Sequence, residues 1–329
     1  MNKLETNISI DAVITWVNGN DKYWQEKINT YSETKIDFSS KKHQKRYNSI
    51  GEIDIAIKSI IKFAPFFKNI YLVTDNQKPE AFESLKSLAK SRGINLQIID
   101  HKIIFSGHEE YLPCFNSCSI GSMLFNIPNL SEHFVIFNDD TFIMSNVAVN
   151  DFFIDGQPII RGQWQKFNEQ RKLRTFYLKF KSFLGKPDKK GYSFKKLQQN
   201  SAKIANTERY IRRFHTPVCL RKSTLENFFK DNENLLEENI KHRFRNENQF
   251  IISSLSEHLE IKKKTFHYRN NAQLTYFRNY KNLFITKLKL KGFEQNKNKI
   301  FITFQSLDMA DDKSLNYILN WIDKQLTFN

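Results

Sequence analysis

Short apolar segments alternate with helical segments along the first half of the chain, and this alternation constrains the fold more than any other feature. Runs rich in β-branched and aromatic residues, each stopped abruptly by polar residues, predict strands at 10–16, 69–75 and 95–100 and two more within 133–144. Apolar residues recur at helical spacing between them, in 21–31, 49–63, 79–92 and 116–125. Strands that alternate with helices in this way are typical of a parallel sheet. We therefore predict an α/β fold with a mostly parallel sheet flanked by helices.

Two of the predicted strands end in polar residues that suit ligand binding. The first strand, in IDAVITWVNGND, gives way to the turn Asn18–Asp21, and Asp21 is placed to cap the helix that follows. A later strand, in HFVIFNDDTF, runs directly into Asn138–Asp140. Ligands of parallel α/β sheets bind beyond the carboxyl ends of the strands, so we expect these two strand ends to meet at one site.

The acidic turn has the chemistry of a metal site. Asp139 and Asp140 supply two carboxylates, backed by the amide of Asn138. Such hard oxygen ligands suit Mg²⁺ or Mn²⁺ bridging a diphosphate, although these residue types also occur simply because they favour a turn. Histidine exchanges protons near neutral pH, so His215 could move a proton, and Arg245 could clamp a phosphate. A lone His is more often structural and a lone Arg is usually a surface cation, and spacing alone does not bring either residue to the metal.

The charge of the chain indicates anionic partners. Its 51 Lys and Arg residues against 35 Asp and Glu residues give a net charge of +16, which suits nucleic acid, acidic lipid or a phosphorylated substrate. No RNA-binding signature accompanies this charge, so we expect no nucleic acid. The three cysteines form no disulfide framework and suit a reducing compartment, and the pair Cys114 and Cys118 lacks the further ligands of a zinc site.

The sequence predicts a cytoplasmic protein that can sit on the inner face of the cell membrane. Its N-terminus has no apolar core of signal-peptide length, and no window approaches the run of about 18 apolar residues that a membrane span needs. Residues 161–213 hold sixteen Lys or Arg and three acidic residues. Within them, 171–186 places aromatic residues on one helical face between cations, which predicts either a helix at an anionic membrane surface or a helix packed on the rest of the protein.

Taken together, these segments resemble the Stealth family of sugar-1-phosphate transferases, which includes bacterial capsule phosphotransferases and the lysosomal-enzyme N-acetylglucosamine-1-phosphotransferase. The first conserved region of the family is similar to IDAVITWVNGND, and the second to KRYNSIGEIDIAIKSIIKFAPFFKNIYLVTDNQKP, YLPCFNSCSI and IPNLSEHFVIFNDDTF. The third is similar to FHTPVCLRKSTLENFF and IKHRFRNENQF, and the fourth, more weakly, to FITFQSLDMADD and the closing helix. The resemblance leaves out two stretches, 152–214 and 263–300.

The resemblance implies a nucleotide-sugar-transferase-like fold and a defined reaction. The hydroxyl group of an acceptor glycan would attack the sugar-proximal phosphorus of a UDP-sugar, and UMP would leave. The sugar would then be linked through a phosphodiester, in the synthesis of a capsule or another surface polysaccharide. A lipid-linked glycan is one form that the acceptor could take.

The resemblance also implies roles for individual residues. The metal ion, Mg²⁺ or Mn²⁺, would be held by Asp139, Asp140 and Asp308. The catalytic residues would be His215, which handles the proton, together with Arg245, Asp140 and Asp21. The donor would be bound by Trp16, Asn18, Gly19, Arg46 and Asn138. Arg46 and Arg245 would stabilise charge on the transferring phosphoryl group.

Two positions depart from the family pattern. Gly121 stands where family members commonly have a Glu, so one carboxylate is missing. Leu307 precedes Asp308 where Asn is usual, which weakens the match around Asp308.

We expect one catalytic domain over 1–329, made of three parts. A donor and metal half lies at about 8–151, a basic helical insertion at 152–214, and a segment that completes the active site at 215–329. Two other functions stay open at this point. One is an ordinary metal-dependent glycosyltransferase that releases UDP, and the other is a non-catalytic protein that binds an anionic membrane or RNA.

Overall fold

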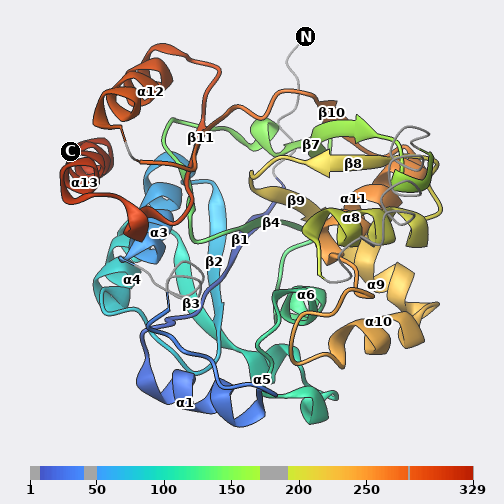
Figure 1. Ribbon diagram of the computed structural model, residues 1–329. Helices are drawn as coiled ribbons and strands as arrows, with labels where there is room; N and C mark the ends of the chain where they lie inside the picture. The colour runs from blue at the N-terminus through green and yellow to red at the C-terminus, as the bar shows by residue number, and fades with distance from the viewer. Residues whose placement is uncertain (1–7, 41–49, 171–191, 281, 329) are drawn as a thin grey trace, which may run out of the picture.

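A five-stranded sheet with the order β3-β2-β1-β4-β9 lies at the centre of the computed structural model, which describes residues 8–40, 50–170, 192–280 and 282–328 (Figure 1). The strands are β1 (Ile10–Thr15), β2 (Phe67–Thr74), β3 (Asn95–Asp100), β4 (His133–Phe137) and β9 (Val218–Arg221). β1 runs parallel to β2 and β4, and β2 runs parallel to β3, whereas β9 is antiparallel to β4. The predicted α/β fold with a mostly parallel sheet is therefore confirmed.

Parallel pairing brings the carboxyl ends of β1, β2 and β4 to one edge of the central sheet. Ile14 pairs with Leu72 on one side and with Phe137 on the other. The turns that follow β1 and β4 therefore lie next to each other at this edge, as we expected from the polar residues at the ends of both strands.

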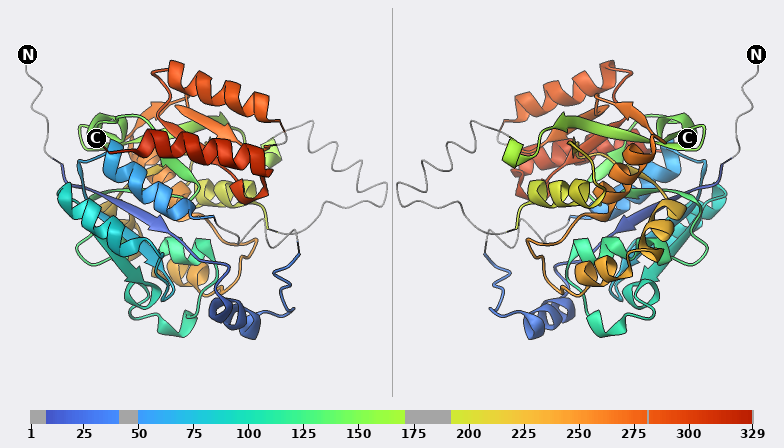
Figure 2. Two further views of the ribbon diagram at one scale, coloured as in Figure 1. Left: turned by 90° about the vertical axis from the view of Figure 1, so that its left-hand side faces the viewer. Right: turned by 90° about the vertical axis from the view of Figure 1, so that its right-hand side faces the viewer.

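The central sheet is buried because helices cover both of its faces. Along β1, Ala12 and Ile14 belong to one apolar cluster and Val13 belongs to the other. The first cluster is completed by α3 (Glu52–Phe63), α4 (Phe82–Ser91), α12 (Leu283–Gln295) and α13 (Asp312–Leu326), with α12 outermost (Figure 2). The second cluster is covered by α5 (His101–Ile104), α6 (Ser117–Ser122), α9 (Lys222–Lys230), α10 (Glu233–Ile240) and α11 (Ile252–Lys263).

Two smaller sheets extend the fold. β7 (Gln157–Gln165) pairs with β6 (Phe153–Ile154), β8 (Tyr210–Arg213) and β10 (His267–Arg269). β12 (Phe301–Phe304) pairs with β5 (Thr141–Ile143) and β11 (Leu274–Phe277).

The segment 152–214, predicted as a helical insertion, is helical only in part. Its described residues contain β6, β7 and β8 besides α8 (Phe194–Ile204). Gly162 in β7 lets β8 approach closely, because it has no side chain. A Cβ atom at Gly162 would lie 2.7 Å from the carbonyl oxygen of Arg212.

The helix starting at Asp21 was predicted well, whereas other helices differ at their ends. α1 (Lys22–Tyr31) has Asp21 as its N-cap. α3 begins at Glu52 rather than at 49, because Gly51 adopts a left-handed conformation with φ of 89° just before it. The helix predicted for 116–125 is divided into α6 and a 3₁₀ turn, Leu124–Asn126.

Two predicted features, Arg46 and the basic helix 171–186, lie outside the described residues. In the part of the chain that the structure describes, no helix has both the length and the apolar character required to cross a membrane.

Candidate active site

The turn after β1 is held in place by Gln77, which follows β2. Its Nε2 donates to the Asn18 carbonyl (3.1 Å) and to Asp21 Oδ2 (2.9 Å), and its Oε1 accepts from the Asn18 N–H (2.9 Å). The other carboxylate oxygen of Asp21 accepts from the N–H groups of Tyr23 and Trp24 and so caps α1. Both oxygens of Asp21 are therefore engaged within the protein. Its geometry is that of a structural residue, and its catalytic role stays a prediction.

The other residues predicted to bind the donor lie at different depths along the same edge. Trp16 belongs to the apolar core and is only 8% exposed, and its backbone N–H donates to the Val73 carbonyl (3.0 Å). The Gly19 carbonyl accepts from the side chain of Gln25 (2.7 Å). Asn138, in contrast, is exposed at the end of β4. Asn138 is therefore open to a ligand at this edge of the sheet, whereas Trp16 is buried beneath the surface.

His215, which lies between β8 and β9, faces the acidic turn after β4. Its Nε2 is 3.1 Å from Asp140 Oδ1 and 3.2 Å from Oδ2. The ring of Tyr276 packs edge-on against the imidazole, with the ring centres 5.7 Å apart. The fold thus joins two residues that their spacing in the sequence does not connect, and the pair has the geometry of a carboxylate that orients a histidine.

Two buried threonines link the same pair from behind. Thr141 Oγ1 is 3.2 Å from Asp140 Oδ1 and 3.0 Å from Thr303 Oγ1. Thr303 Oγ1 is in turn 3.2 Å from the carbonyl oxygen of His215. The contacts between β5 and β12 therefore fix both members of the pair in position.

Asp139 lies in an electrostatically strained environment. Burial of its carboxyl group raises its pKa to about 7, and the negative charges of Asp140 and Glu52 add to the shift. Glu52 is buried in the first turn of α3. Three carboxylates therefore repel one another at this edge of the sheet, and a bound cation would relieve the repulsion.

Asp308, in a short 3₁₀ turn after β12, belongs to the same acidic region. Burial raises the pKa of Tyr280, and nearby negative charges add to that shift. These charges include those of Asp140, Glu52 and Asp308. Acidic residues from three separate parts of the chain therefore lie near Tyr280.

The donor chemistry of Asp139 and Asp140 fits Mg²⁺ or Mn²⁺, because both ions prefer hard oxygen ligands. In the described ranges, however, no group of three or more His, Cys, Asp or Glu side chains is placed to hold a metal ion. The three-carboxylate site of Asp139, Asp140 and Asp308 consequently stays a prediction.

Arg245 lies at the N-terminus of α6. Its Nη2 donates to Ser117 Oγ (3.0 Å), and its guanidinium group packs over the ring of Tyr192 at 5.1 Å from the ring centre. Asn116 anchors the loop that carries Arg245 by donating to two of its carbonyl groups. The contacts described for Arg245 are on this helix end and not with His215, so its role at the phosphate stays a prediction.

Gly121 lies in α6 where that helix faces α11. A Cβ atom at this position would lie 3.4 Å from Ile252 Cγ2, an ordinary van der Waals distance. The contacts of Gly121 therefore give no steric reason why this chain has a glycine here.

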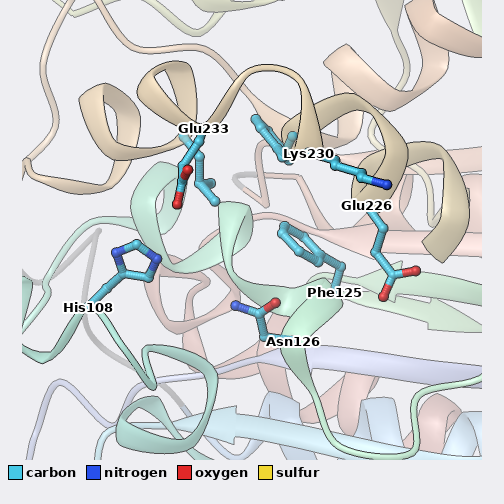
Figure 3. A pocket seen from close by; sticks show the side chains of 8 residues that line it. His108, Phe125, Asn126, Glu226, Lys230 and Glu233 are labelled. Carbon is cyan, nitrogen blue, oxygen red and sulfur yellow. The ribbon is translucent and has the colours of Figure 1, made fainter.

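A separate open hollow of about 400 Å³ lies between α9, α10 and the loop that carries His108 (Figure 3). Phe125 and Phe229 form its apolar floor, and Glu226 and Lys230 are among its charged residues. None of the residues predicted for the site lines it.

The structure adds residues that the sequence did not single out. Glu52 reads as an ordinary acidic residue in the first turn of a helix. Thr303 and Tyr276 lie on strands β12 and β11, in or next to regions that matched the family weakly or not at all. Their role becomes visible only when β11 and β12 are placed beside β5.

Comparison with known proteins agrees with the resemblance on which these roles rest. The model of Stealth protein conserved region 1 matches residues 9–36, and that of conserved region 2 matches residues 46–159. The alignment with a solved galactosyltransferase structure covers 97% of each chain at 10% identity, with a TM-score of 0.47. This similarity is too low to support an argument about function.

Bacterial polysaccharide phosphotransferases are similar over longer stretches. A capsular polysaccharide phosphotransferase of Haemophilus influenzae is 30% identical over 264 residues, which are 76% of this chain and 65% of that protein. An exopolysaccharide phosphotransferase of Lactiplantibacillus plantarum is 32% identical over 270 residues, 74% of this chain and 73% of that protein. A receptor polysaccharide phosphotransferase of Streptococcus oralis is 40% identical over 152 residues, 45% and 43% of the two chains. The chain thus spans from under half to about three quarters of these relatives, and by these matches it belongs to the Stealth family.

Proposed function

We propose that this protein transfers a sugar-1-phosphate from a UDP-sugar to a hydroxyl group of an acceptor glycan, with release of UMP. The product would be a phosphodiester-linked sugar in a capsule or another surface polysaccharide. One observation carries the proposal. His215 and Asp140 are in hydrogen-bond contact at the carboxyl edge of the sheet, in a chain whose relatives are named polysaccharide phosphotransferases.

His215 is the proton acceptor in this proposal. A neutral imidazole that donates from Nε2 to Asp140 has Nδ1 as its basic nitrogen. That nitrogen takes the proton of the attacking hydroxyl group, while Asp140 keeps the ring oriented and stabilises the imidazolium that forms. Tyr276 restricts the ring by packing against it.

We assign a divalent cation, Mg²⁺ or Mn²⁺, to Asp139 and Asp140, with Asp308 as a third ligand. When bound, the ion supplies positive charge that neutralises the diphosphate of the donor. The raised pKa of Asp139 supports this assignment, since burial and the neighbouring charges of Asp140 and Glu52 disfavour its ionised form, which a bound cation would favour.

The remaining roles follow the family resemblance. The donor lies along Trp16, Asn18, Gly19 and Asn138, where the edge of the sheet is polar and Asn138 is exposed. Arg245 and Arg46 stabilise the transferring phosphoryl group, with Arg245 reaching it from the N-terminus of α6. The acceptor is a glycan that can be lipid-linked, and 171–186 binds the anionic inner face of the cell membrane.

The leaving nucleotide tests the reaction. With a panel of UDP-sugars, Mg²⁺ and oligosaccharide acceptors, we expect UMP to be released in proportion to phosphodiester product. Steady release of UDP instead would establish an ordinary glycosyltransferase.

Two substitutions test the site. We expect His215→Ala and Asp140→Asn each to lower kcat by about a hundredfold or more, the scale of general acid–base catalysis. His108→Ala, in the separate hollow, is the matched control and should leave kcat unchanged. If both site variants kept the wild-type rate, the catalytic assignment would be wrong.

A further inference from the structure

The outward face of α12 is apolar although nothing in the described structure covers it. Phe284, Ile285 and Leu288 are 68%, 51% and 52% exposed. Large apolar side chains clustered at the surface in this way mark an interaction site more often than chance exposure.

This face is distinct from the one that packs α12 onto the protein. Thr286, Leu290 and Phe293 are buried, and the Phe293 ring packs edge-on against Trp321 of α13. At about 100° per residue, Phe284 and Leu288 point away from that buried face. α12 therefore has two apolar faces, and the fold uses only one of them.

Positive charge borders the exposed face. Lys287, Lys289 and Lys291 are all exposed on α12. Its single acidic residue, Glu294, is also exposed, and its carboxylate accepts from Trp321 Nε1 (2.8 Å) and the side chain of Gln325 (3.2 Å) on α13. The exposed surface of α12 therefore combines apolar side chains with three lysines and one carboxylate, an excess of positive charge.

We propose that α12 docks on the surface of an anionic lipid bilayer and lies in the plane of the interface. Phe284, Ile285 and Leu288 would enter the boundary between headgroups and acyl chains, and Lys291 would reach the anionic headgroups. Lys287 and Lys289, which pack over the rings of Tyr317 and Phe277, add positive charge beside the face. Charge complementarity identifies the occupant, since the chain carries a net charge of +16 and the exposed lysines of α12 outnumber its one glutamate by three to one.

Docking through α12 also orients the candidate active site. β11 ends at Phe277 and α12 begins at Leu283. Lys289 Nζ donates back to the carbonyl of Tyr276 (3.4 Å), the residue whose ring packs on His215. The inference depends neither on the proposed reaction nor on the segment 171–186, because it rests on the surface of α12 alone.

A fluorescent probe on α12 tests the docking directly. The native cysteines Cys114, Cys118 and Cys219 are buried, and burial raises the pKa of each thiol to about 12, 11 and 12. They therefore react slowly, and an environment-sensitive dye can be placed selectively on Leu288→Cys. The matched control is Ile103→Cys, which is 42% exposed on α5.

We expect the dye on Leu288→Cys, and not on Ile103→Cys, to shift to shorter wavelength with phosphatidylglycerol vesicles and to stay unshifted with phosphatidylcholine vesicles. No shift with either lipid, or equal shifts with both, would overturn the proposal. A shift that needs no vesicles and grows with protein concentration would show instead that a second copy of the chain covers this face.

Vesicle co-sedimentation of the unlabelled full chain provides a second measurement. The double variant Phe284→Ser/Leu288→Ser should bind phosphatidylglycerol vesicles at least about tenfold more weakly than wild type, since each side chain loses its apolar burial. Ile103→Ser should bind as wild type does. Unchanged binding of the double variant would place the membrane contact elsewhere on the chain and contradict the proposal. Both substitutions are at exposed positions, so an unaltered melting temperature verifies folding.

Discussion

Two threonine hydroxyl groups behind the pair of His215 and Asp140 have more hydrogen-bond contacts than protons. Thr141 and Thr303 together carry two hydroxyl protons, yet they make three contacts, with Asp140, with each other and with the carbonyl of His215. Only two of the three contacts can hold a proton at once. The hydroxyl orientation is therefore coupled to the charge of Asp140, because an ionised carboxylate competes for the proton of Thr141.

This arrangement makes Thr303 a positioning residue for the proposed reaction. We expect Thr303→Val to lower kcat about fivefold with little change in KM for the UDP-sugar, because a hydrogen bond of about 1 kcal/mol that fixes the His215 backbone is lost. Steady-state kinetics of UMP release measures both constants.

Thr303→Ser is the control, since it keeps the hydroxyl group and should restore most of kcat. Equal losses in the serine and valine variants would show that keeping the hydroxyl group is not enough, and would contradict the role of its hydrogen bond.

Sequence patterns could identify the acidic turn but not all of its surroundings. Asp139 and Asp140 follow an apolar strand directly, which is a local signal. Glu52 and Thr303 have no such signal, because their importance comes from the approach of α3 and β12 to that turn in the folded chain. The pairing of His215 with Asp140 is likewise a product of tertiary structure, and the family resemblance implied only that both residues belong to the active site.

Among the secondary-structure elements, the strands of the central sheet that lie before residue 140 were easier to predict than those in the segment 152–214. The strand predicted at 95–100 is β3, and the one at 10–16 differs from β1 by one residue, because apolar β-branched runs bounded by polar residues leave little choice. β7 was not predicted, because the segment 152–214 was interpreted as helical from its basic composition and the helical spacing of its aromatic residues. Its pairing with β8 and β10 depends on residues more than forty positions away, which no local pattern contains.

His258 connects the helix α11 to strand β8, and its contacts require a neutral ring. Its Nε2 accepts from the N–H of Ile211 (3.0 Å), and its Nδ1 is 2.6 Å from the carbonyl of Ser254. Burial lowers its pKa from 6.5 to about 4. Between these two values the unfolded chain binds a proton that the folded protein does not, so the free energy of unfolding falls as the pH is lowered.

We expect His258 alone to account for a loss of about 2 kcal/mol in the free energy of unfolding between pH 7 and pH 5. His258→Gln should be less stable than wild type at pH 7, and that difference should shrink by the same amount at pH 5. Urea unfolding at the two pH values measures it. His108→Gln, at the surface hollow, should retain the wild-type pH dependence. A difference between His258→Gln and wild type that does not change with pH would show that the ring is not kept neutral.

At the scale of the whole molecule, the acidic region is assembled from segments that lie far apart in the chain. Glu52 comes from α3, Asp139 and Asp140 from the turn after β4, and Asp308 from the turn after β12. Because Asp139 is buried beside the charges of Asp140 and Glu52 only in the folded protein, a cation bound at this turn should stabilise the fold as a whole.

We expect MgCl₂ to raise the melting temperature of the nucleotide-free protein at pH 8. When the Mg²⁺ concentration is about one hundred times the Kd, binding adds about 2.7 kcal/mol to the free energy of unfolding. For a chain of this size that raises the melting temperature by about 4 °C. Because the pKa of Asp139 is raised to about 7, protons compete with the ion below that pH, so the increase should be smaller at pH 6 than at pH 8. Differential scanning calorimetry with MgCl₂ and with EDTA measures the effect.

Substitutions decide whether the ion binds where we place it. Asp139→Asn and Asp140→Asn should each lose most of the Mg²⁺-dependent increase in melting temperature, because each removes a ligand charge. Glu83→Gln, on the exposed surface of α4, should keep the full increase and controls for nonspecific salt effects. Asp139→Asn should also melt higher than wild type in EDTA at pH 8, since it removes a charge that burial and its neighbours disfavour. An increase in melting temperature that survives both substitutions would locate the cation away from the acidic turn, and the metal assignment would then fail even if UMP release were observed.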